Sequence, residues 1–443
     1  MLGALIIEPK NSYYLNPKNG CPLTHGTKAI ICQPGGKKYR EFVLFVYDFA
    51  LLFDKNNKPI NPPEVPGSHD DPGVMGINYR CEPMKERLKI KDDPAHIFSS
   101  FVHGDPATPL LETYPNEEMI IRLVDGAHEE QHSFNITGLA WKKEITNINS
   151  PLVQQQTIGI SEAFNIHINQ KYQAGDYLYY FSGIDDLWLG LSSIIRVHSV
   201  LQKDLIPLYK PISCQSQHYL EPPIGANIRY FEIAAIQKEI EYYAYGDHDP
   251  DGLIFISYAD RHKVKKKSYH PKPLILRVRA GEWIEITLHN LIDPHRPIKQ
   301  DFYPSVPVKY KHTPSLEVSL QPQFLKHNPI HSSGINLGYN SIEQTVKPGN
   351  EIKYLWYANK EYGSCLLTSF ADIRNHRHHG LFVAIIIEPK DTINLHPSHF
   401  MHKDCQEQKL IQLKYNQSFQ EFVLFVQNGI RLLDKKINSF RQH

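Results

Sequence analysis

The chain has 443 residues, in which 48 Lys and Arg balance 47 Asp and Glu, so that its formal net charge at pH 7 is +1. This balance produces no global field that would attract nucleic acid, and we expect no nucleic-acid partner. No run of about 18 apolar residues occurs, so we expect no membrane span. Tyr, Phe and Pro are frequent (25, 20 and 32 residues) and no long stretch has a helical period, a combination that favours an all-β fold.

The first and last parts of the sequence repeat each other. Residues 4–10 read ALIIEPK and residues 384–390 read AIIIEPK, while residues 41–46 and 421–426 both read EFVLFV. The two matches share an offset of 380 residues with no gap between them. A repeat at a fixed period indicates a repeating architecture. We therefore expect one full period with a partial unit at each end, as in a split or truncated gene product.

Within this period the pattern divides once more. Turns feed alternating strands at residues 116–125 and 281–290, and a Gly-Leu pair leads into an Ile-rich strand after residues 190 and 380. Short β-prone segments separated by turns are typical of Greek-key β-sandwiches. We predict two complete sandwiches, at residues 38–200 and 226–390, joined by a linker at 201–225. Residues 1–37 should contain the last strand of a preceding domain and a linker. Residues 391–443 should contain a linker and the first strand of a further domain.

The six cysteines do not indicate a metal or disulfide framework. They are scattered without CxxC spacing, which is not the pattern of a zinc knuckle or a disulfide-dense scaffold. One or two disulfides remain open. The N-terminal decapeptide has no basic start, and its apolar run is too short for a secretory signal. The compartment therefore also remains open.

Several of these segments resemble the cupredoxin domains of multicopper oxidases. Residues 104–110 (GDPATPL) and 132–138 (HSFNITG) resemble the first half of such a domain, residues 175–180 (GDYLYY) resemble the GxYxYHCH strand, and the Gly-Leu pairs resemble the start of the last strand. The chain is similar to large bacterial multicopper oxidases built, like ceruloplasmin, from serial cupredoxins, including manganese-oxidising ones. The resemblance covers nearly the whole chain.

This resemblance implies tandem cupredoxin-like Greek-key β-sandwiches with copper as the cofactor. In the parent protein it implies oxidation of a metal ion or an organic reductant, with electrons passing from a blue copper to O₂ at a trinuclear cluster. Neighbouring cupredoxin domains, or fragments of the same parent, are the implied partners. The family works outside the cytoplasm or on surfaces.

The resemblance also implies where copper ligands should lie in the first sandwich. A blue copper site needs two imidazoles and one thiolate in a trigonal set. His132 matches the first imidazole, but the HCH triplet of the family falls on Tyr180, Phe181 and Ser182, and the second imidazole position is Asp186. We expect no complete copper site here, and a core or surface histidine is the alternative for His132.

In the second sandwich the ligand pattern is mixed. His376 fits the HxxxG-Leu pattern of the second imidazole. Cys365 is the candidate thiolate, but it is displaced from the expected position. Aligning the glycines at 175 and 363 puts the thiolate position at Ser369, whereas counting back from His376 puts it at Ala371. The first imidazole position holds Val318. One ligand fits, one is displaced and one is missing.

His376 and His378 also form an HxH pair. Residues two apart point to one side of an extended strand, and trinuclear clusters of the family use such pairs from two domains. The pair is therefore a candidate half of an interdomain cluster, with a charged, solvated loop as the alternative. The candidate metal ligands of the chain are thus His132, Cys365, His376 and His378.

Two other metal patterns are weaker. Residues 128–132 (HEEQH) match HExxH, which binds zinc only on a helix, and here it runs into a β-prone segment. Residues 247–252 copy the first half of a calcium loop but have Tyr258 at the twelfth position, so an acidic turn is the alternative.

The chain alone cannot complete the copper circuit of the parent oxidase. The expected function is therefore multicopper-oxidase-like with an incomplete copper site, and isolated catalysis is not expected. The alternative is a non-catalytic structural or interaction module, in which the predicted strand at residues 4–8 adds to the sheet edge of a partner.

Overall fold

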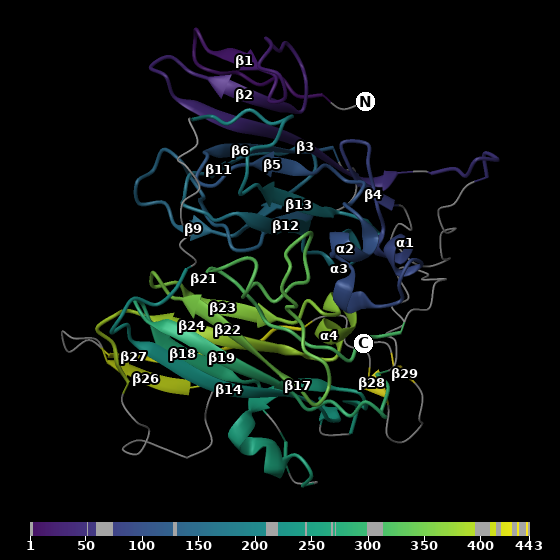
Figure 1. Ribbon diagram of the computed structural model, residues 1–443. Coiled ribbons are helices and arrows are strands. Elements are labelled where there is room, and N and C mark those ends of the chain that lie inside the picture. The colour runs from purple at the N-terminus through teal and green to yellow at the C-terminus, as the bar shows by residue number, and fades with distance from the viewer. Residues whose placement is uncertain are drawn as a thin grey trace.

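Two β-sandwiches make up most of the structure. The computed structural model describes residues 3–50, 52–58, 74–126, 131–209, 220–243, 246–266, 269–270, 272–298, 313–394, 408–412, 418–427, 432–433 and 440–441. Figure 1 shows the first sandwich, in blue, above the second, in green. The all-β expectation is confirmed. Across these ranges no helix is long and apolar enough to cross a membrane.

The first sandwich packs one sheet of order β1-β2-β3-β6-β11, with β4 paired to β3, against a second sheet of order β10-β7-β12-β13-β5. Its neighbours are antiparallel except for two parallel pairs, β3 with β6 and β5 with β13. The strands have these bounds: β1 (Tyr13–Leu15), β2 (Lys28–Cys32), β3 (Lys38–Ala50), β4 (Val74–Ile77), β5 (Leu111–Thr113), β6 (Met119–Asp125), β7 (His132–Ile136), β10 (Gln155–Ile158), β11 (Ala163–Ile168), β12 (Gly175–Phe181) and β13 (Ser192–Val197).

The second sandwich has the same arrangement. One sheet has the order β17-β14-β19-β22-β21 and the other the order β18-β24-β23-β20. The parallel pairs are again two, β14 with β19 and β18 with β24, at the positions of the parallel pairs in the first sandwich. The strands have these bounds: β14 (Ile228–Gln237), β17 (Leu253–Ser257), β18 (Ile275–Arg279), β19 (Trp283–Asn290), β20 (Gln321–Pro322), β21 (Lys326–His327), β22 (Glu351–Tyr357), β23 (Gly363–Thr368) and β24 (Phe382–Glu388).

Short elements complete the described chain. Two of the helices matter for the site, α3 (Ile184–Leu189) and α4 (Ile373–His378). The others are α1 (Met84–Leu88), η1 (Pro94–His96), α2 (Ser100–His103) and η2 (Tyr258–Lys263). The remaining strands pair in small sheets: β8 (Trp141–Lys142), β9 (Leu152–Val153), β15 (Ile240–Glu241), β16 (His248–Asp249), β25 (Ile393–Asn394), β26 (Gln408–Gln412), β27 (Ser418–Phe422), β28 (Leu432–Leu433) and β29 (Phe440–Arg441).

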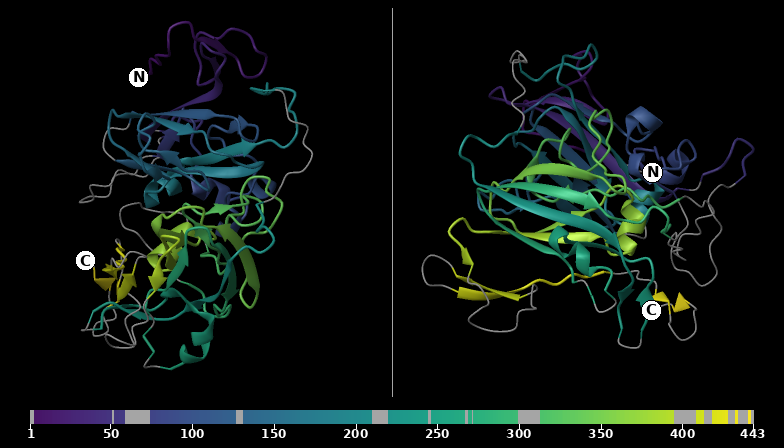
Figure 2. Two further views of the ribbon diagram at one scale, coloured as in Figure 1. Left: turned by 90° about the vertical axis from the view of Figure 1, so that its left-hand side faces the viewer. Right: turned by 60° about the horizontal axis from the view of Figure 1, so that its bottom comes forward.

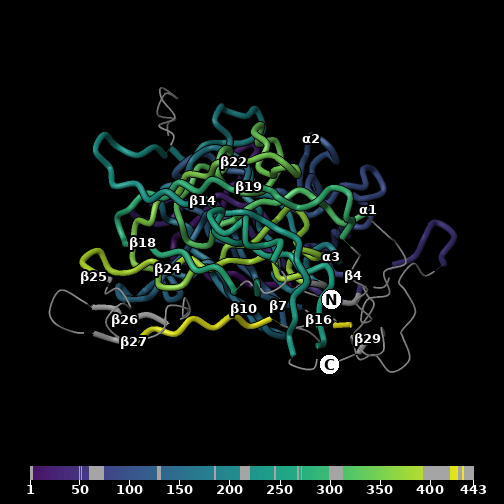
Figure 3. Tube along the Cα trace, turned by 90° about the horizontal axis from the view of Figure 1, so that it is seen from below, coloured from purple at the N-terminus to yellow at the C-terminus, as the bar shows by residue number. Residues whose placement is uncertain are grey.

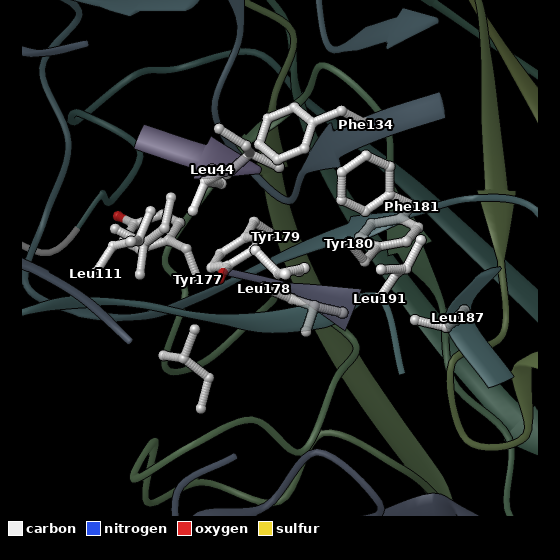
Figure 4. Packing of buried hydrophobic residues seen from close by; sticks show 14 of the residues in the cluster. Leu44, Leu111, Phe134, Tyr177, Leu178, Tyr179, Tyr180, Phe181, Leu187 and Leu191 are labelled. Carbon is white, nitrogen blue, oxygen red and sulfur yellow. The ribbon is translucent and has the colours of Figure 1, made fainter. Parts of the chain in front are cut away.

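Strand β12 is buried on both of its faces, which explains its run of aromatic residues. Tyr179 and Phe181 pack into the core of the first sandwich around Phe134, with ring centroids 6.1 and 5.4 Å from that of Phe134 (Figure 4). Tyr180 points the other way and meets Phe370 of the second sandwich at 5.6 Å. Aromatic rings bury a large apolar area each, so this strand joins the core to the contact between the sandwiches.

The 380-residue repeat recurs in the strand pairing. Strands β1, β2 and β3 form an antiparallel set in which Cys32 pairs with Lys38, and β25, β26 and β27 form one in which Gln412 pairs with Ser418. Each partner is 380 residues from its counterpart. The two ends of the 380-residue period therefore share this antiparallel pairing. Figure 2 shows the second set, in yellow, on the outside of the second sandwich.

The first repeat segment corrects one expectation. Residues 4–8 do not form the predicted strand and have no regular secondary structure. Glu8 instead holds this segment to the first sandwich, because its carboxylate accepts hydrogen bonds from Arg122 of β6 and, at 2.9 Å, from Gln33. The domain boundaries expected from the sequence stay predictions.

Candidate metal centre

His132 and Asp186 meet at one end of the first sandwich. His132 opens β7, Asp186 lies on α3, and both are buried. The Nδ1 atom of His132 lies 2.9 Å from Oδ1 of Asp186. A carboxylate only accepts, so His132 Nδ1 donates this hydrogen bond. The first and second imidazole positions of the family pattern are therefore in direct contact, but one of them is a carboxylate.

Two further positions of the pattern lie at the same place. The ring of Phe181, at the thiolate position, packs edge-on against His132 with centroids 6.0 Å apart. Leu191, at the axial position, is buried, and its carbonyl accepts the backbone N–H of Phe181 at 3.0 Å. Figure 4 shows Phe181, Leu191 and Leu187 among the buried residues of this core cluster. We call this cluster of His132, Phe181, Asp186 and Leu191 the first pole.

The first pole carries negative charge. Burial alone would lower the pKa of His132, but the hydrogen bond and charge of Asp186, with smaller contributions from Asp125 and Asp48, outweigh it and raise the pKa of His132. Within the described ranges, Nε2 of His132 and Oδ2 of Asp186 have no hydrogen-bond partner. The pole thus favours an imidazolium held among carboxylates.

The equivalent end of the second sandwich contains a serine and a histidine. Nδ1 of His376 lies 2.9 Å from Oγ of Ser369, and Nε2 lies 3.0 Å from the carbonyl of Ser315. The Ser369 hydroxyl also accepts the backbone N–H of Ser319 at 3.1 Å. The backbone next to Val318 therefore lies at this site, while the Val318 side chain belongs to the core of the second sandwich. We call Val318, Ser369, His376 and Leu381 the second pole.

Hydrogen bonding fixes the tautomer of His376. A carbonyl only accepts, so Nε2 carries the proton, and burial lowers the pKa of His376 so that the ring is favoured in its neutral form. Nδ1 then accepts from the Ser369 hydroxyl. Both ring nitrogens are engaged within the protein, and metal binding through either would break a buried hydrogen bond. The contact also selects Ser369, and not Ala371, as the thiolate position.

The two poles share one backbone turn. The backbone N–H of Leu191 donates to the carbonyl of Asp186 at 2.9 Å, and that of Leu381 donates to His376 at the same distance. A glycine with positive φ follows each helix, at 117° for Gly190 and 94° for Gly380. Glycine adopts this conformation without the steric cost of a Cβ. The Gly-Leu signal in the sequence thus encodes a real turn.

The HxH pair does not have the expected geometry. His376 and His378 lie on α4, a helix whose first turn is capped by Asp372, with the Asn375 N–H donating to Oδ1 at 3.1 Å. Residues two apart on a helix point to different sides, in contrast to a strand. Both histidines are buried. The extended-strand expectation is therefore wrong, and so is the alternative of a solvated loop.

Cys365 lies in the core, away from the thiolate position. It is buried on β23 and pairs with Ile385 of β24, as Tyr177 of β12 pairs with Ile195 of β13. Burial raises the pKa of the Cys365 thiol to about 12. A neutral thiol packed in the core is a poor nucleophile at neutral pH. These registers match the expected alignment of Cys365 with Tyr177, several residues before the thiolate position.

Between the poles, aromatic contacts join the two sandwiches. Tyr180 precedes Phe181 and Phe370 follows Ser369, at positions where the HCH triplets of the family have histidines. The rings of Tyr180 and Phe370 pack edge-to-face. Arg377 of α4 reaches across to the carbonyl of Ser182 at 3.3 Å. At these interface positions the described residues are thus two aromatic rings, Tyr180 and Phe370, and the guanidinium of Arg377, whereas an interdomain copper cluster needs imidazoles.

The two weaker metal patterns form no metal site among the described residues. Residues 128–130 of HEEQH lie outside the described residues, and His132 is on a strand, not a helix. In the acidic turn, Asp249 accepts a hydrogen bond from His379 at 2.8 Å. In the part of the chain that the structure describes, no three His, Cys, Asp or Glu side chains are grouped so that they could hold a metal ion.

Sequence reasoning missed two features of the poles. It located the ligand positions, but it did not foresee that Asp186 would bind His132 or that Ser369 would bind His376. The identity of the substituted residues was the available signal, because Asp and Ser are natural hydrogen-bond partners of imidazole. His379, also missed, pairs with Asp249 through the acidic turn.

Comparisons with known proteins give only distant likenesses. No protein-family model matches the sequence, and no curated protein matches it. Among solved structures, a copper nitrite reductase from Nitrosomonas europaea has 11% identity and a TM-score of 0.24, over 78% of this chain and 92% of that one. A multicopper oxidase has 11% identity and a TM-score of 0.25, over 82% and 94%. A laccase from Botrytis aclada has 12% identity and a TM-score of 0.23, over 78% and 63%. Likenesses of this size do not carry a functional argument.

Proposed function

We propose that this chain is a non-catalytic structural module of cupredoxin-like sandwiches whose two copper poles are closed by hydrogen bonds within the protein. The observation that carries the proposal is the contact of His132 with Asp186, which joins two positions that copper would have to bridge. The hydrogen bond replaces the metal as the link between β7 and α3.

The donor set at each pole argues against copper chemistry. A blue copper site requires two imidazoles and a thiolate. The first pole offers one imidazole, a carboxylate and a phenyl ring, and the second offers one imidazole, a hydroxyl and an isopropyl group. Neither pole fits the cofactor that the resemblance implies, so no electron-transfer step is assigned to this chain.

A structural role explains what the poles do contain. Removing one partner of a buried ion pair costs several kcal/mol, so the pair holds its two elements together once formed. The first pole ties α3 to the sheet, and α3 lies beside α4 through Trp188 and Arg374, whose guanidinium lies 4.9 Å from the Trp188 ring centroid. The poles thus stabilise the surfaces through which the two sandwiches pack.

An oxygen-uptake assay tests the proposal. The purified full chain is incubated with copper and then supplied with Mn²⁺, Fe²⁺ or a phenolic reductant, with a laccase as the positive control. We expect oxygen consumption equal to that of copper and reductant without protein. Copper-dependent consumption that a buried-pole variant such as Ser369→Ala abolishes would show that the chain is an oxidase after all.

A further inference from the structure

His96 lies between two carboxylates that belong to different sandwiches. It is the last residue of η1, in the first sandwich. Its Nδ1 atom lies 2.8 Å from Oδ2 of Asp93, and its Nε2 atom lies 3.1 Å from Oε1 of Glu343 in the second sandwich. A carboxylate only accepts hydrogen bonds, and an imidazole donates from both nitrogens only as an imidazolium. The two contacts together therefore require the protonated ring.

The two carboxylates are not held equally firmly. Asp93 is the N-cap of η1, where it accepts the backbone N–H of Ala95 at 3.1 Å, and its Oδ2 atom also lies 3.0 Å from Nζ of Lys91. The side chain of Asp93 is 23% exposed, whereas that of Glu343 is 57% exposed. A neutral His96 has one ring proton, which stays on Nδ1 because Asp93 is the better fixed acceptor. Loss of the second proton therefore breaks the contact with Glu343, which is the one between the sandwiches.

The charges around the ring favour its protonated form. The hydrogen bond to Asp93 raises the pKa of His96, whereas burial lowers it. The charges of Asp93 and Glu343 raise it further, against the opposing charge of Lys91, and the net pKa of His96 is raised. On α2, burial and nearby cationic groups lower the pKa of His103 to about 4, so this neighbour is neutral in the range where His96 titrates.

Glu343 is linked both to η1 and to a second carboxylate. The side-chain amide of Asn336 donates to Oε1 of Glu343 at 2.9 Å and to the backbone carbonyl of Ala95 at 3.0 Å. The hydroxyl of Thr345 lies 2.9 Å from the same Oε1 atom and also contacts the carboxylate of Glu317. Two carboxylates that share one hydroxyl repel each other, so a positive charge on His96 stabilises this side of the contact.

Backbone hydrogen bonds continue the same contact. The N–H of Ser100 in α2 donates to the carbonyl of Gly338, and the N–H of Gly338 donates to the carbonyl of Phe98, both at 2.9 Å. Before η1, Asp92 accepts the backbone N–H of Thr313 at 3.2 Å. Figure 3 shows α2, in blue, beside a green loop of the second sandwich. The amides of Ser100 and Gly338 therefore report directly on whether this edge of the contact is closed.

We propose that His96 is a proton-dependent clasp between the two sandwiches, which holds η1 against Glu343 as an imidazolium and releases this contact when the ring becomes neutral. The clasp goes beyond the proposed function, because it makes the packing of the two sandwiches respond to pH. Its contribution is fully present below the unfolded pKa of about 6.5 and is lost as the pH rises through the raised folded pKa of His96. The contact of Tyr180 with Phe370 is aromatic, so release loosens the edge at η1 without separating the sandwiches.

Hydrogen exchange of the full chain tests the clasp. The exchange rates of the Ser100 and Gly338 amides are divided by their intrinsic rates at each pH, so that protection is compared without the chemical effect of pH. In a series that starts below about pH 6.5, we expect protection to fall by about threefold as the pH rises, the size expected for one partly exposed ion pair. His96→Gln carries no titratable ring and should show the lower protection at every pH.

Two further variants make the test specific. Glu343→Gln changes an exposed side chain, removes the charge that favours the imidazolium, and should flatten the pH profile as His96→Gln does. His198→Gln is the matched control, because Nε2 of His198 lies 3.1 Å from Oε1 of Glu112 within the first sandwich, and this variant should keep the wild-type profile. Protection that does not change with pH in the wild type, or a fall that persists in His96→Gln or Glu343→Gln, would overturn the clasp. Copper plays no part in this measurement, so its failure is distinguishable from failure of the proposed function.

Discussion

His132 and Asp186, 54 residues apart in the sequence, share a buried hydrogen bond of 2.9 Å at the end of the first sandwich. This contact places an imidazole and a carboxylate where the family pattern has two imidazoles. The equivalent end of the second sandwich repeats the arrangement with Ser369 and His376. In the first pole this one hydrogen bond leaves His132 Nε2 and Asp186 Oδ2 without a partner among the described residues, whereas in the second pole both ring nitrogens of His376 are engaged.

The first prediction concerns the stability of the first pole. Asp186→Ala leaves His132 buried without its acceptor and should lower the free energy of unfolding by about 3–5 kcal/mol. Asp186→Asn retains an acceptor oxygen and should lose only about 1–2 kcal/mol. Urea denaturation measures both values. Equal losses in the two variants would show that the hydrogen bond contributes little.

The two pole histidines should have opposite pH dependences. The pKa of His132 is raised in the fold, chiefly by Asp186 against the effect of burial, with Asp125 and Asp48 adding to it. Its contribution is therefore fully present below the unfolded pKa of about 6.5 and is lost as pH rises through the folded pKa. The stability advantage of the wild type over His132→Asn should shrink as the pH rises above about 6.5 and through the raised folded pKa.

For His376 the sign is reversed. Burial lowers its pKa, with the charge of Asp372 opposing and that of His379 reinforcing the effect. The unfolded chain binds a proton near pH 6.5 that the folded chain does not, so stability falls as pH drops below that value. Between about pH 7 and pH 5 the wild type should lose more stability than His376→Asn. Parallel pH profiles for the two variants would contradict the assigned charge states.

Cys365 should be unreactive in the folded protein. Its thiol is buried and burial raises its pKa to about 12, so almost no thiolate exists at neutral pH. Alkylation followed by peptide mapping should label exposed Cys21 rapidly and Cys365 only after denaturation. Rapid native labelling of Cys365 would mean that the core around β23 opens readily.

Restoring the missing ligands should restore a metal site at the first pole. Phe181→Cys together with Asp186→His would give two imidazoles and one thiolate at positions that already meet, which is the set that blue copper requires. The double variant should bind one copper with an intense thiolate band, despite the loss of stability from the smaller Cys side chain. Asp186→His alone should give no such band. Copper binding by the double variant without the band would show that the positions do not converge as described.

The sequence predicted the repeated and regular parts of this protein well. Alternating strands, the 380-residue repeat and the Gly-Leu turn at residues 190 and 380 all depend on local patterns, and local patterns determine strands and turns directly. The position of Cys365 followed from one aligned glycine. These features required no knowledge of long-range contacts.

The contents of the poles could not be predicted in the same way. The pairing of His132 with Asp186 joins β7 to α3, and nothing local to either residue specifies it. The HxH pair was misinterpreted for a different reason. The family pattern suggested an extended segment at these histidines. Instead, Asp372 caps a helix there, because its side chain accepts the N–H of Asn375. The exposure of Phe422, Leu424 and Val426 became apparent only from the comparison with the buried side chains at the same positions in β3.

Copper binding by the wild-type chain tests the central claim most directly. The purified full chain is loaded anaerobically with copper, freed of excess metal, and analysed for bound copper and for its visible spectrum. Poles closed by internal hydrogen bonds predict far less than one copper per chain and no thiolate band. Stoichiometric copper with an intense blue band would contradict the account, because it would require a thiolate to reach a pole and, at the second pole, His376 to give up a buried hydrogen bond.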